Sequence, residues 1–299
     1  MSSLPKAQQS PDGVLVSIGV PTYRRAEQLR KTLQSLVQQT YQNLEILISD
    51  NASDDGQTQQ VAQQFMEQDH RIRYHCHAHN VGMYANFKSV FEQSTGDYFC
   101  WVADDDTRSP DFIEACLSVY QSTDLSPSAE PLVVVNTYSA LKDRTENTTL
   151  GIDKGCTTVG LSPFKRYYQY LSTIYTNQAA VGDLIYGLMK RSSVEAAFSI
   201  QPNILSWDHI FLATLALRGE FHTIPEVKMV SSPRGMSTKG DPVAMAQIQG
   251  IENSLYISKA RWVRVFFLLQ RVWQTPGITF GDKIWMGQWL IMDTLQGHC

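Results

Sequence analysis

Three consecutive carboxylates, Asp104 to Asp106, follow a short apolar run in the first half of the chain. Carboxylates held this close repel one another, and a nearby cation offsets that cost. Mg²⁺ and Mn²⁺ take oxygen ligands, usually one or two carboxylates together with substrate phosphates. An acidic turn before a helix is the alternative, because aspartate is favoured at helix N-termini. The run therefore predicts either a metal–phosphate site or a solvated turn.

A second polar cluster favours the metal–phosphate interpretation. Asp50 ends another apolar run and is followed by small polar residues up to Asp55. A carboxylate in this place can accept hydrogen bonds from ribose hydroxyls or from a base N–H group. Tyr23 and Arg24 follow a third run and could form a stacking and charged wall beside a base or a phosphate. Together the clusters predict a site for a nucleoside diphosphate and a metal ion.

These polar residues all follow apolar runs that are rich in β-branched residues. The runs start at residues 14, 44, 71 and 98, and the segments between them have helical apolar periodicity. Such regular spacing is typical of β-α repeats, and a fifth strand is expected at Leu132–Val135. Alternating strands and helices predict an α/β fold with a mostly parallel, doubly wound sheet. Ligands of such sheets bind beyond the carboxyl ends of the strands, so we expect the polar residues to share one edge.

The composition argues against several classes of protein. The 299 residues carry a formal net charge of −4, which argues against a general nucleic-acid-binding protein. No apolar run approaches the roughly 20 residues that a membrane-spanning helix needs. Neither G-x-G-x-x-G nor G-x-x-x-x-G-K-S/T occurs, which disfavours dinucleotide redox enzymes and P-loop enzymes. Five cysteines without a C-x-x-C pair fit a reduced, cytoplasmic protein.

Five motifs in order carry a resemblance to a known family. They are Val16–Arg25 (VSIGVPTYRR), Ile48–Asp54 (ISDNASD), Asn80–Gly82 (NVG), Gly96–Tyr98 (GDY) and Asp104–Asp106 (DDD). In sequence and order this set resembles the family 2 glycosyltransferases, which are inverting enzymes of the GT-A fold. The resemblance covers about residues 14–120 and is thinner beyond them.

The resemblance implies roles for residues within these motifs. The residues that it places around the nucleotide are Pro21, Thr22, Tyr23, Arg25, Asp50, Asn51, Asn80, Gly82, Asp104 and Asp105. Among them, Asp50 resembles the carboxylate that holds the uracil or the ribose. The acidic run stands at the D-x-D metal motif, which many members write as Asp-x-Asp-Asp, with Ala103 here at the first place. We favour Asp105 and Asp106 as ligands of Mn²⁺ or Mg²⁺, and the register within the run stays open.

Two later residues also receive roles from the resemblance. Asp208, in the segment Ile204–His209, resembles the late acidic motif that supplies the general base of inverting members. An N-cap of the apolar helix that follows is the alternative for this carboxylate. Arg234 lies in a stretch that resembles a flexible loop over the diphosphate, where many members carry a histidine metal ligand. It could contact a phosphate instead, and a purely structural loop is the alternative.

The function that the resemblance implies is that of an inverting, metal-dependent glycosyltransferase. Such an enzyme moves a sugar from a nucleotide-diphosphate sugar, with UDP favoured, to an acceptor hydroxyl in polysaccharide, glycolipid or other glycan synthesis. A sugar-nucleotide-binding protein that has lost catalysis is one alternative, because the first metal aspartate and the late histidine are missing. A nucleotidyltransferase on a similar fold is the other.

The chain is expected to divide into three parts. A disordered lead-in, 1–13, precedes a GT-A domain, 14–240, and a helical C-terminal extension, 241–299, follows it. Within the domain, the nucleotide-binding half is expected at 14–120 and the acceptor half at 121–240.

The C-terminal extension has an unusual pattern of aromatic and basic residues. Four apolar residues share one helical face, and no acidic residue occurs between Asn253 and Gly281. The four are Trp262, Phe266, Leu269 and Trp273. Packing on the α/β domain or on a second subunit would explain them, and so would an interfacial helix on an anionic membrane. We expect a cytoplasmic protein, and three alternatives stay open for 250–299: packing on the α/β domain, a homodimer, or a peripheral contact at the inner face of the membrane.

Overall fold

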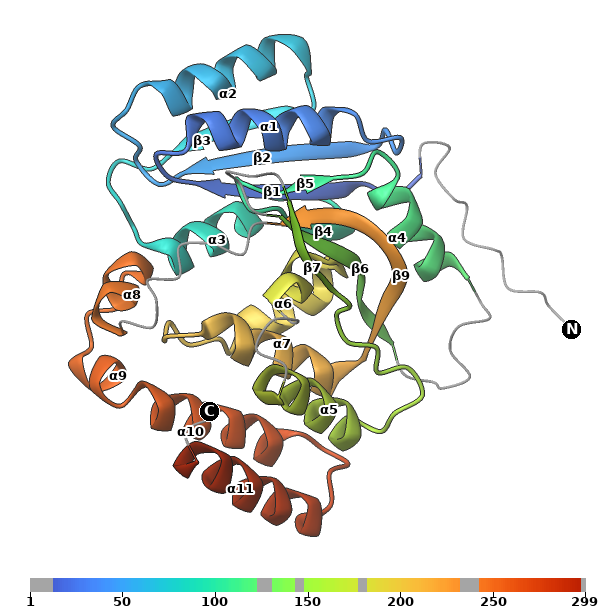
Figure 1. Cartoon of the computed structure of the whole chain (residues 1–299), viewed down its shortest axis with the longest axis vertical. Helices are drawn as coiled ribbons and strands as arrows, with labels where there is room; N and C mark the ends of the chain where they lie inside the picture. Colours follow the sequence, from blue (N-terminus) through green and yellow to red (C-terminus); the bar gives the residue numbers. More distant parts are fainter. Residues whose placement is uncertain (1–12, 123–130, 143–147, 177–181, 232–241, 297–299) are drawn as a thin grey trace, which may run out of the picture.

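The computed structural model describes residues 13–122, 131–142, 148–176, 182–231 and 242–296. Within these residues one nine-stranded sheet runs through the molecule, with helices on both of its faces (Figure 1). The predicted lead-in falls, except for Gly13, outside the described residues, and so does Arg234. The boundaries expected for the domain and for its two halves stay predictions.

Four parallel strands form the first half of the sheet. They are β1 (Val16–Thr22), β2 (Leu44–Asp50), β3 (Ile72–Cys76) and β4 (Tyr98–Trp101), in the spatial order β3-β2-β1-β4. Every residue of β1 and β2 is buried, as expected for central strands that are covered on both faces. The four apolar runs therefore become four strands, and the residues at the carboxyl ends of β1 and β2 pair with each other.

Helices cover both faces of these strands because each helix carries an apolar stripe. α1 (Ala26–Val37), α2 (Gln57–Gln68) and α4 (Phe112–Gln121) bury their stripes in one core. α3 (Met83–Glu92) contributes to the other core, where Phe91 packs edge-on against Phe99 of β4. The doubly wound arrangement expected from the sequence is therefore confirmed (Figure 1).

The second half of the sheet is mixed. β8 (Leu188–Lys190) pairs antiparallel with β4, and β6 (Leu132–Lys142) pairs antiparallel with β8. β9 (Glu220–Ser231) then runs parallel to β6. The expected strand at Leu132–Val135 is the start of β6, but it does not join β4 directly, because the later strand β8 lies between them. Short strands β5 (Thr107–Arg108) and β7 (Thr149–Asp153) pair antiparallel with β9 and β6.

Aromatic side chains fill the space between the second half of the sheet and its helices. The elements around them are α5 (Pro163–Thr176), the 3-10 helix η1 (Gly182–Tyr186), α6 (Arg191–Phe198) and α7 (Trp207–Arg218). Trp101 of β4 packs edge-on against Phe211 of α7, and Phe198 of α6 stacks on Trp207. α7 is buried on nearly every side, in agreement with its almost continuous apolar sequence.

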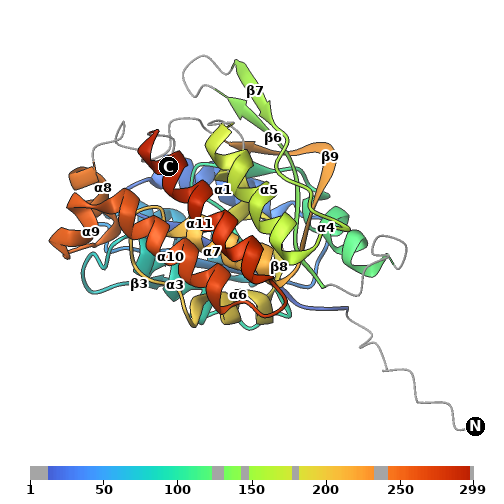
Figure 2. The same ribbon diagram turned by 90° about the horizontal axis from the view of Figure 1, so that it is seen from below.

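Four helices follow β9 in the described part of the chain. They are α8 (Pro242–Gln249), α9 (Ser254–Ser258), α10 (Ala260–Gln274) and α11 (Phe280–Leu295). α10 and α11 lie side by side, with α10 against α7 and α11 against α5 (Figure 2). The expected helical extension is therefore confirmed. No helix in the described residues combines the length and the apolar character needed to cross a bilayer.

Candidate functional site

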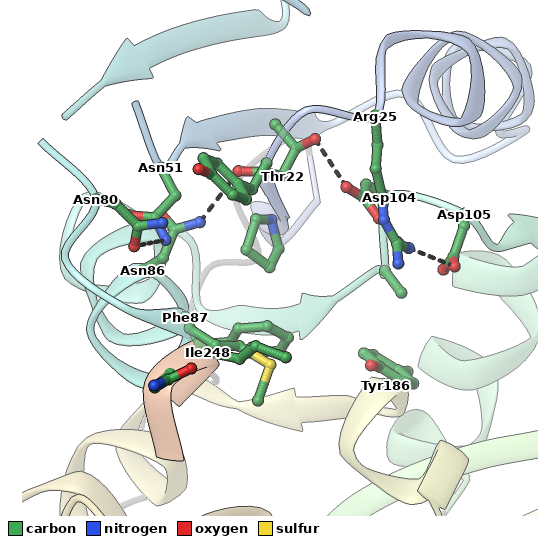
Figure 3. A pocket seen from close by; sticks show the side chains of 15 residues that line it. Thr22, Arg25, Asn51, Asn80, Asn86, Phe87, Asp104, Asp105, Tyr186 and Ile248 are labelled. Carbon is green, nitrogen blue, oxygen red and sulfur yellow. Dashed lines mark hydrogen bonds and ion pairs between the residues drawn. The ribbon is translucent and has the colours of Figure 1, made fainter. Parts of the chain in front are cut away.

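A cavity of about 370 Å³ lies at the carboxyl ends of the parallel strands (Figure 3). Its walls come from the loops after β1, β2, β3 and β4, from α3 and η1, and from α8. The lining residues are Pro21, Thr22, Tyr23, Arg25, Asn51, Asn80, Met83, Asn86, Phe87, Ala103, Asp104, Asp105, Tyr186, Gln247 and Ile248. All of the predicted nucleotide-binding residues are among them except Asp50 and Gly82. The polar loops therefore meet at the expected edge of the sheet.

Arg25 joins the loop after β1 to the acidic loop after β4. Its Nη1 donates hydrogen bonds to Oδ2 of Asp105 at 2.7 Å and to Oδ1 of Asp104 at 3.2 Å. The hydroxyl of Thr22 donates to the other carboxylate oxygen of Asp104 at 2.8 Å. Burial raises the pKa of the Asp104 carboxyl, while the charge of Arg25 and these hydrogen bonds partly oppose that rise. One guanidinium thus compensates two carboxylates at the cavity wall (Figure 3).

The acidic run divides between the cavity and the protein interior. Asp104 and Asp105 line the cavity, whereas Asp106 is buried with its Oδ2 3.9 Å from Nη1 of the fully buried Arg108. The main-chain carbonyl of Asp106 also accepts a hydrogen bond from the hydroxyl of Thr32. Of the two predicted metal ligands, the structure brings only Asp105 to the cavity wall. Asp106 contributes instead to the core beneath it.

The carboxylates at the cavity suit a divalent ion that shares its ligands with a substrate. Asp104 and Asp105 supply hard oxygen atoms, and Mg²⁺ or Mn²⁺ typically takes one or two carboxylates together with phosphate oxygens. The described residues contain no cluster of three or more acidic, histidine or cysteine side chains that could hold a metal by themselves. The donor set therefore fits a metal that binds together with a diphosphate.

Asn51 and Asn80 connect the loops that follow β2 and β3. Nδ2 of Asn51 donates to Oδ1 of Asn80 at 2.9 Å, and Oδ1 of Asn51 accepts from the main-chain N–H of Val81 at 2.8 Å. Both asparagines line the cavity, so this pair holds two of its loops at a fixed separation. Either amide could exchange its contact for one with a bound ligand.

Asp50 lies beneath the cavity rather than in its wall. It has no exposed surface, and its carboxylate accepts hydrogen bonds from the Tyr74 hydroxyl at 2.7 Å and from the Ser53 N–H at 2.9 Å. Burial and the bond to Asp50 raise the pKa of the Tyr74 hydroxyl well above its usual range. Asp50 therefore positions the loop that carries Asn51, and a direct contact with the nucleotide would require a movement of the residues that bury it.

Gly82 allows a close contact between two segments behind the cavity wall. Its φ is +84°, and a Cβ atom on it would lie 2.7 Å from the carbonyl oxygen of Gln249 and 2.8 Å from the Cα of Gly250. Only glycine combines this conformation with so close an approach. The contact brings the end of α8 against the loop after β3, and the same helix contributes Gln247 and Ile248 to the wall.

Asp208 lies in the first turn of α7. The N-cap of this helix is Ser206, so the capping alternative for Asp208 does not apply. Ser206 has a φ of +57°, and the other non-glycine residues with positive φ in the described chain are Arg24 and Ala52, which flank Arg25 and Asn51. Unfavourable backbone conformations of this kind concentrate at functional sites. The strain thus marks two loops of the cavity and the turn that presents Asp208.

Tyr186 connects Asp208 electrostatically to the cavity. Burial raises the pKa of the Tyr186 hydroxyl well above its usual range, and the charges of Asp106, Asp183 and Asp208 raise it further. Because Tyr186 lines the cavity, Asp208 lies within electrostatic range of the wall without belonging to it. Burial lowers the pKa of the adjacent His209, and the neighbouring carboxylate of Asp208 opposes that shift.

The apolar part of the wall is absent from the sequence-based prediction. Met83 and Phe87 are four residues apart on α3, directly after the Asn80–Gly82 motif, so helical spacing was a usable signal for them. Gln247 and Ile248 carry no such signal, because only the fold brings α8 to the strand ends. The predicted phosphate contact Arg234 lies outside the described residues.

Comparison with known proteins identifies the family. The profile of Glycosyl transferase family 2 matches residues 17–169, which is just over half of the chain. The chain belongs to this family. The match includes β1 to β4 and the polar loops of the cavity, whereas the lining residues Tyr186, Gln247 and Ile248 lie beyond it.

Curated relatives of this glycosyltransferase match only part of its length. An uncharacterized glycosyltransferase of Rickettsia felis is 33% identical over 111 residues, which are 37% of this chain and 18% of that protein. The Campylobacter jejuni GalNAc(5)-diNAcBac-PP-undecaprenol beta-1,3-glucosyltransferase is 34% identical over 93 residues, 30% of this chain and 29% of that protein. The chain thus spans less than a third of the length of these two relatives.

Solved structures share the fold over nearly the whole chain. S. aureus TarS 1–349 in complex with UDP-GlcNAc superposes with a TM-score of 0.64 at 13% identity, covering 94% of this chain and 72% of TarS. A mannosyltransferase from Pyrobaculum calidifontis in complex with GDP-Man and Mn²⁺ gives a TM-score of 0.53 at 15% identity, covering 94% and 86%. These similarities establish the GT-A fold for this family 2 glycosyltransferase.

Proposed function

We propose that this glycosyltransferase moves a sugar from a nucleoside-diphosphate sugar, with UDP favoured, to an acceptor hydroxyl with inversion at the anomeric carbon. The observation that carries the proposal is the cavity where Arg25 bridges Asp104 and Asp105 beside the paired Asn51 and Asn80. Neutral hydrogen-bonding groups and a charged cluster side by side suit a nucleoside and a diphosphate. The same fold in TarS holds UDP-GlcNAc, which supports a UDP-sugar as donor.

The donor's two charged phosphates need compensation, and the site offers two sources of it. Arg25 supplies a guanidinium that can turn from the carboxylates to phosphate oxygens. Mn²⁺ or Mg²⁺ held by Asp104 and Asp105 would neutralise the leaving diphosphate when bound. The Mn²⁺ in the Pyrobaculum calidifontis enzyme supports metal dependence here. Tyr23 offers its ring to the base.

Asp208 is the general base of the proposed reaction. Its carboxylate takes the proton from the acceptor hydroxyl as that oxygen bonds to the anomeric carbon. The bond from the anomeric carbon to the phosphate oxygen breaks at the same time, and the electron pair leaves with the diphosphate. Attack opposite to the leaving group inverts the configuration. The strained Ser206 and the electrostatic link to Tyr186 support this role for Asp208.

The acceptor is proposed to be a glycan or a lipid-linked glycan. The Campylobacter jejuni relative is named for an acceptor that carries a diphosphate-linked undecaprenol, which supports a lipid-linked class. We also place the reaction in the cytoplasm, because the described cysteines are all free thiols and three of the four are buried. The product would enter polysaccharide, glycolipid or other glycan synthesis.

Replacement of the proposed base tests the mechanism. Asp208→Asn keeps the shape of the side chain but cannot accept the proton, so sugar transfer and donor hydrolysis should fall about 10²- to 10⁴-fold. Titration calorimetry with UDP and Mn²⁺ should give an unchanged Kd, because Asp208 does not line the cavity. Glu195→Gln, at an exposed position on α6, is the matched control. Full turnover by Asp208→Asn would refute the assignment of the base.

A sugar-nucleotide-binding protein without catalysis is the second candidate. The observations in its favour are Ala103 at the first place of the metal motif and Arg25 on the carboxylates that would otherwise face a metal. The wild-type protein with Mn²⁺ and a panel of sugar nucleotides distinguishes the two functions. Binding without release of the nucleoside diphosphate would favour this second candidate.

A further inference from the structure

α10 and α11 expose an unusual number of large apolar side chains. Every exposed phenylalanine and tryptophan in the described residues lies on these two helices. The exposed side chains are Trp262, Phe266 and Trp273 on α10, and Phe280, Ile284, Trp285, Ile291, Met292 and Leu295 on α11. We call these nine residues the α10–α11 face. Contiguous exposed apolar surface of this kind typically marks an interaction site.

The α10–α11 face is continuous across the two helices. On α10 the spacing of Trp262, Phe266 and Trp273 places all three on one side, while Val265 and Leu268 are buried on the other. Phe280 at the start of α11 packs edge-on against Trp273, with 5.9 Å between the ring centroids. Figure 2 shows the two helices side by side on one side of the molecule. Trp285 lies at the edge of this face, because its ring also packs edge-on against Phe164 and Tyr168 of α5. The helices are thus anchored by one side, and the other exposed side chains of the face remain open to a partner.

Basic residues border this face, and the two carboxylates of α11 are hydrogen-bonded or partly buried. Lys259 and Arg261 are exposed beside Trp262, and the ammonium group of Lys283 lies 5.8 Å from the ring centre of Trp273. Asp282 accepts a hydrogen bond from the Thr279 hydroxyl at the start of α11. Asp293 has a buried carboxylate oxygen. The outward surface is therefore apolar with a positive border.

We propose that the α10–α11 face docks the protein on the surface of an anionic lipid bilayer. Tryptophan and phenylalanine insert at the boundary between headgroups and acyl chains, and lysine and arginine bind anionic headgroups. Two helices that are amphipathic and lie side by side fit a position in the plane of the interface. A symmetric contact with a second copy fits less well, since it would bring the basic borders of both copies together. The proposal does not depend on the transfer reaction.

Vesicle flotation with the full chain tests the proposal. The protein should float with vesicles of phosphatidylcholine and phosphatidylglycerol, and much less with phosphatidylcholine alone. Higher salt should weaken the binding, because the electrostatic part is screened. The double variant Phe266→Ser, Trp273→Ser should lower the partition coefficient at least about tenfold. Lys259→Glu with Arg261→Glu should remove the preference for anionic lipid.

Control variants and the oligomeric state make the test decisive. Leu150→Ser with Ile152→Ser removes exposed apolar side chains from β7 and should leave vesicle binding unchanged. The melting temperature of each variant confirms that it folds. No binding of the wild-type protein to either vesicle would overturn the proposal. A concentration-dependent dimer that the Phe266→Ser, Trp273→Ser variant abolishes, without vesicle binding, would assign the face to a second copy.

Discussion

The loops of the cavity and the turn before α7 differ in how their polar groups are satisfied. In the cavity loops, Arg25, Asn51 and Asp104 all have side-chain partners on a neighbouring loop. Around α7, by contrast, Oδ1 of Asn203, Nε1 of Trp207 and Nδ1 of His209 are buried without a hydrogen-bond partner among the described residues. Buried polar atoms are usually paired, so such a group of exceptions needs a reason. The polar side chains of the cavity loops thus already have partners, whereas buried polar atoms around the turn that carries Asp208 have none among the described residues.

This difference agrees with the two tasks of the proposed reaction. A nucleotide and its diphosphate are common to all donors, and a rigid site lowers the entropic cost of binding them. The turn that carries Asp208, which the proposed mechanism assigns to the acceptor, has buried polar atoms that ordered water could satisfy. Of the three predictions below, the asparagine pair tests this comparison directly, and the other two test how buried carboxylates are compensated.

The largest expected effect separates two neighbouring carboxylates of the acidic run. By the proposed mechanism, Asp105→Asn should lower the rate of donor hydrolysis about 10²- to 10³-fold, because it removes one of the two carboxylates that would hold the metal beside the diphosphate. Asp106→Asn should instead cost about 3 kcal/mol of unfolding free energy, since it leaves the buried Arg108 without its charge partner. Hydrolysis assays and thermal unfolding of both variants measure this. Equal losses of activity at normal stability would place Asp106 in the site.

A matched pair of asparagines measures the difference in hydrogen bonding directly. Asn51→Ala breaks two paired contacts and should cost about 1–2 kcal/mol, with weaker binding of UDP. Asn203→Ala removes an oxygen that has no partner and a single long bond, 3.4 Å from Nδ2 to the Gly250 carbonyl, so it should cost less, about 0.5 kcal/mol. Urea unfolding of the two variants gives both values. If Asn203→Ala were as costly as Asn51→Ala, both regions would be organised to the same degree.

The last prediction is a pH dependence of stability that arises from Asp153 of β7. Burial raises the pKa of the Asp153 carboxyl to about 7, and the nearby charge of Asp183 adds to the rise. The folded state therefore binds a proton that the unfolded chain releases above about pH 4, so stability should fall between about pH 4 and pH 7. Asp153→Asn should remove this slope and be more stable by about 1–2 kcal/mol at pH 8. Chemical unfolding at pH 5 and pH 8 tests it, and a slope that persists in the variant would exclude Asp153 as its source.

The sequence predicts the donor side well because its signals are local. Strand, loop and helix repeat at regular intervals, and parallel strands bring their carboxyl ends together, so Thr22, Asn51, Asn80 and Asp105 meet without further information. The direction in which each side chain points is harder to predict from the sequence. Asp50 and Asp106 carry the right chemistry but point into the interior, where Tyr74 and Arg108 bind them.

The second half is harder to predict because its contacts connect distant segments. β8 lies in the sheet between β4 and β6, and its three residues carry no sequence pattern that predicts this position. Gln247 and Ile248 reach the cavity wall because Gly82 and Gly250 are in contact. Neither glycine predicts this contact from the sequence alone. Long-range pairing of this kind is a property of the folded chain rather than of any local window.

The contact of α8 with Gly82 has a consequence for the order of events during synthesis. All five family motifs leave the ribosome long before α8, so the nascent chain carries its recognition residues while one wall of the cavity is missing. A chain that stops before α8 would still be recognised as a family member by its sequence. Its donor cavity would nevertheless be open on one side, and translation must reach Ile248 before the enclosure is complete.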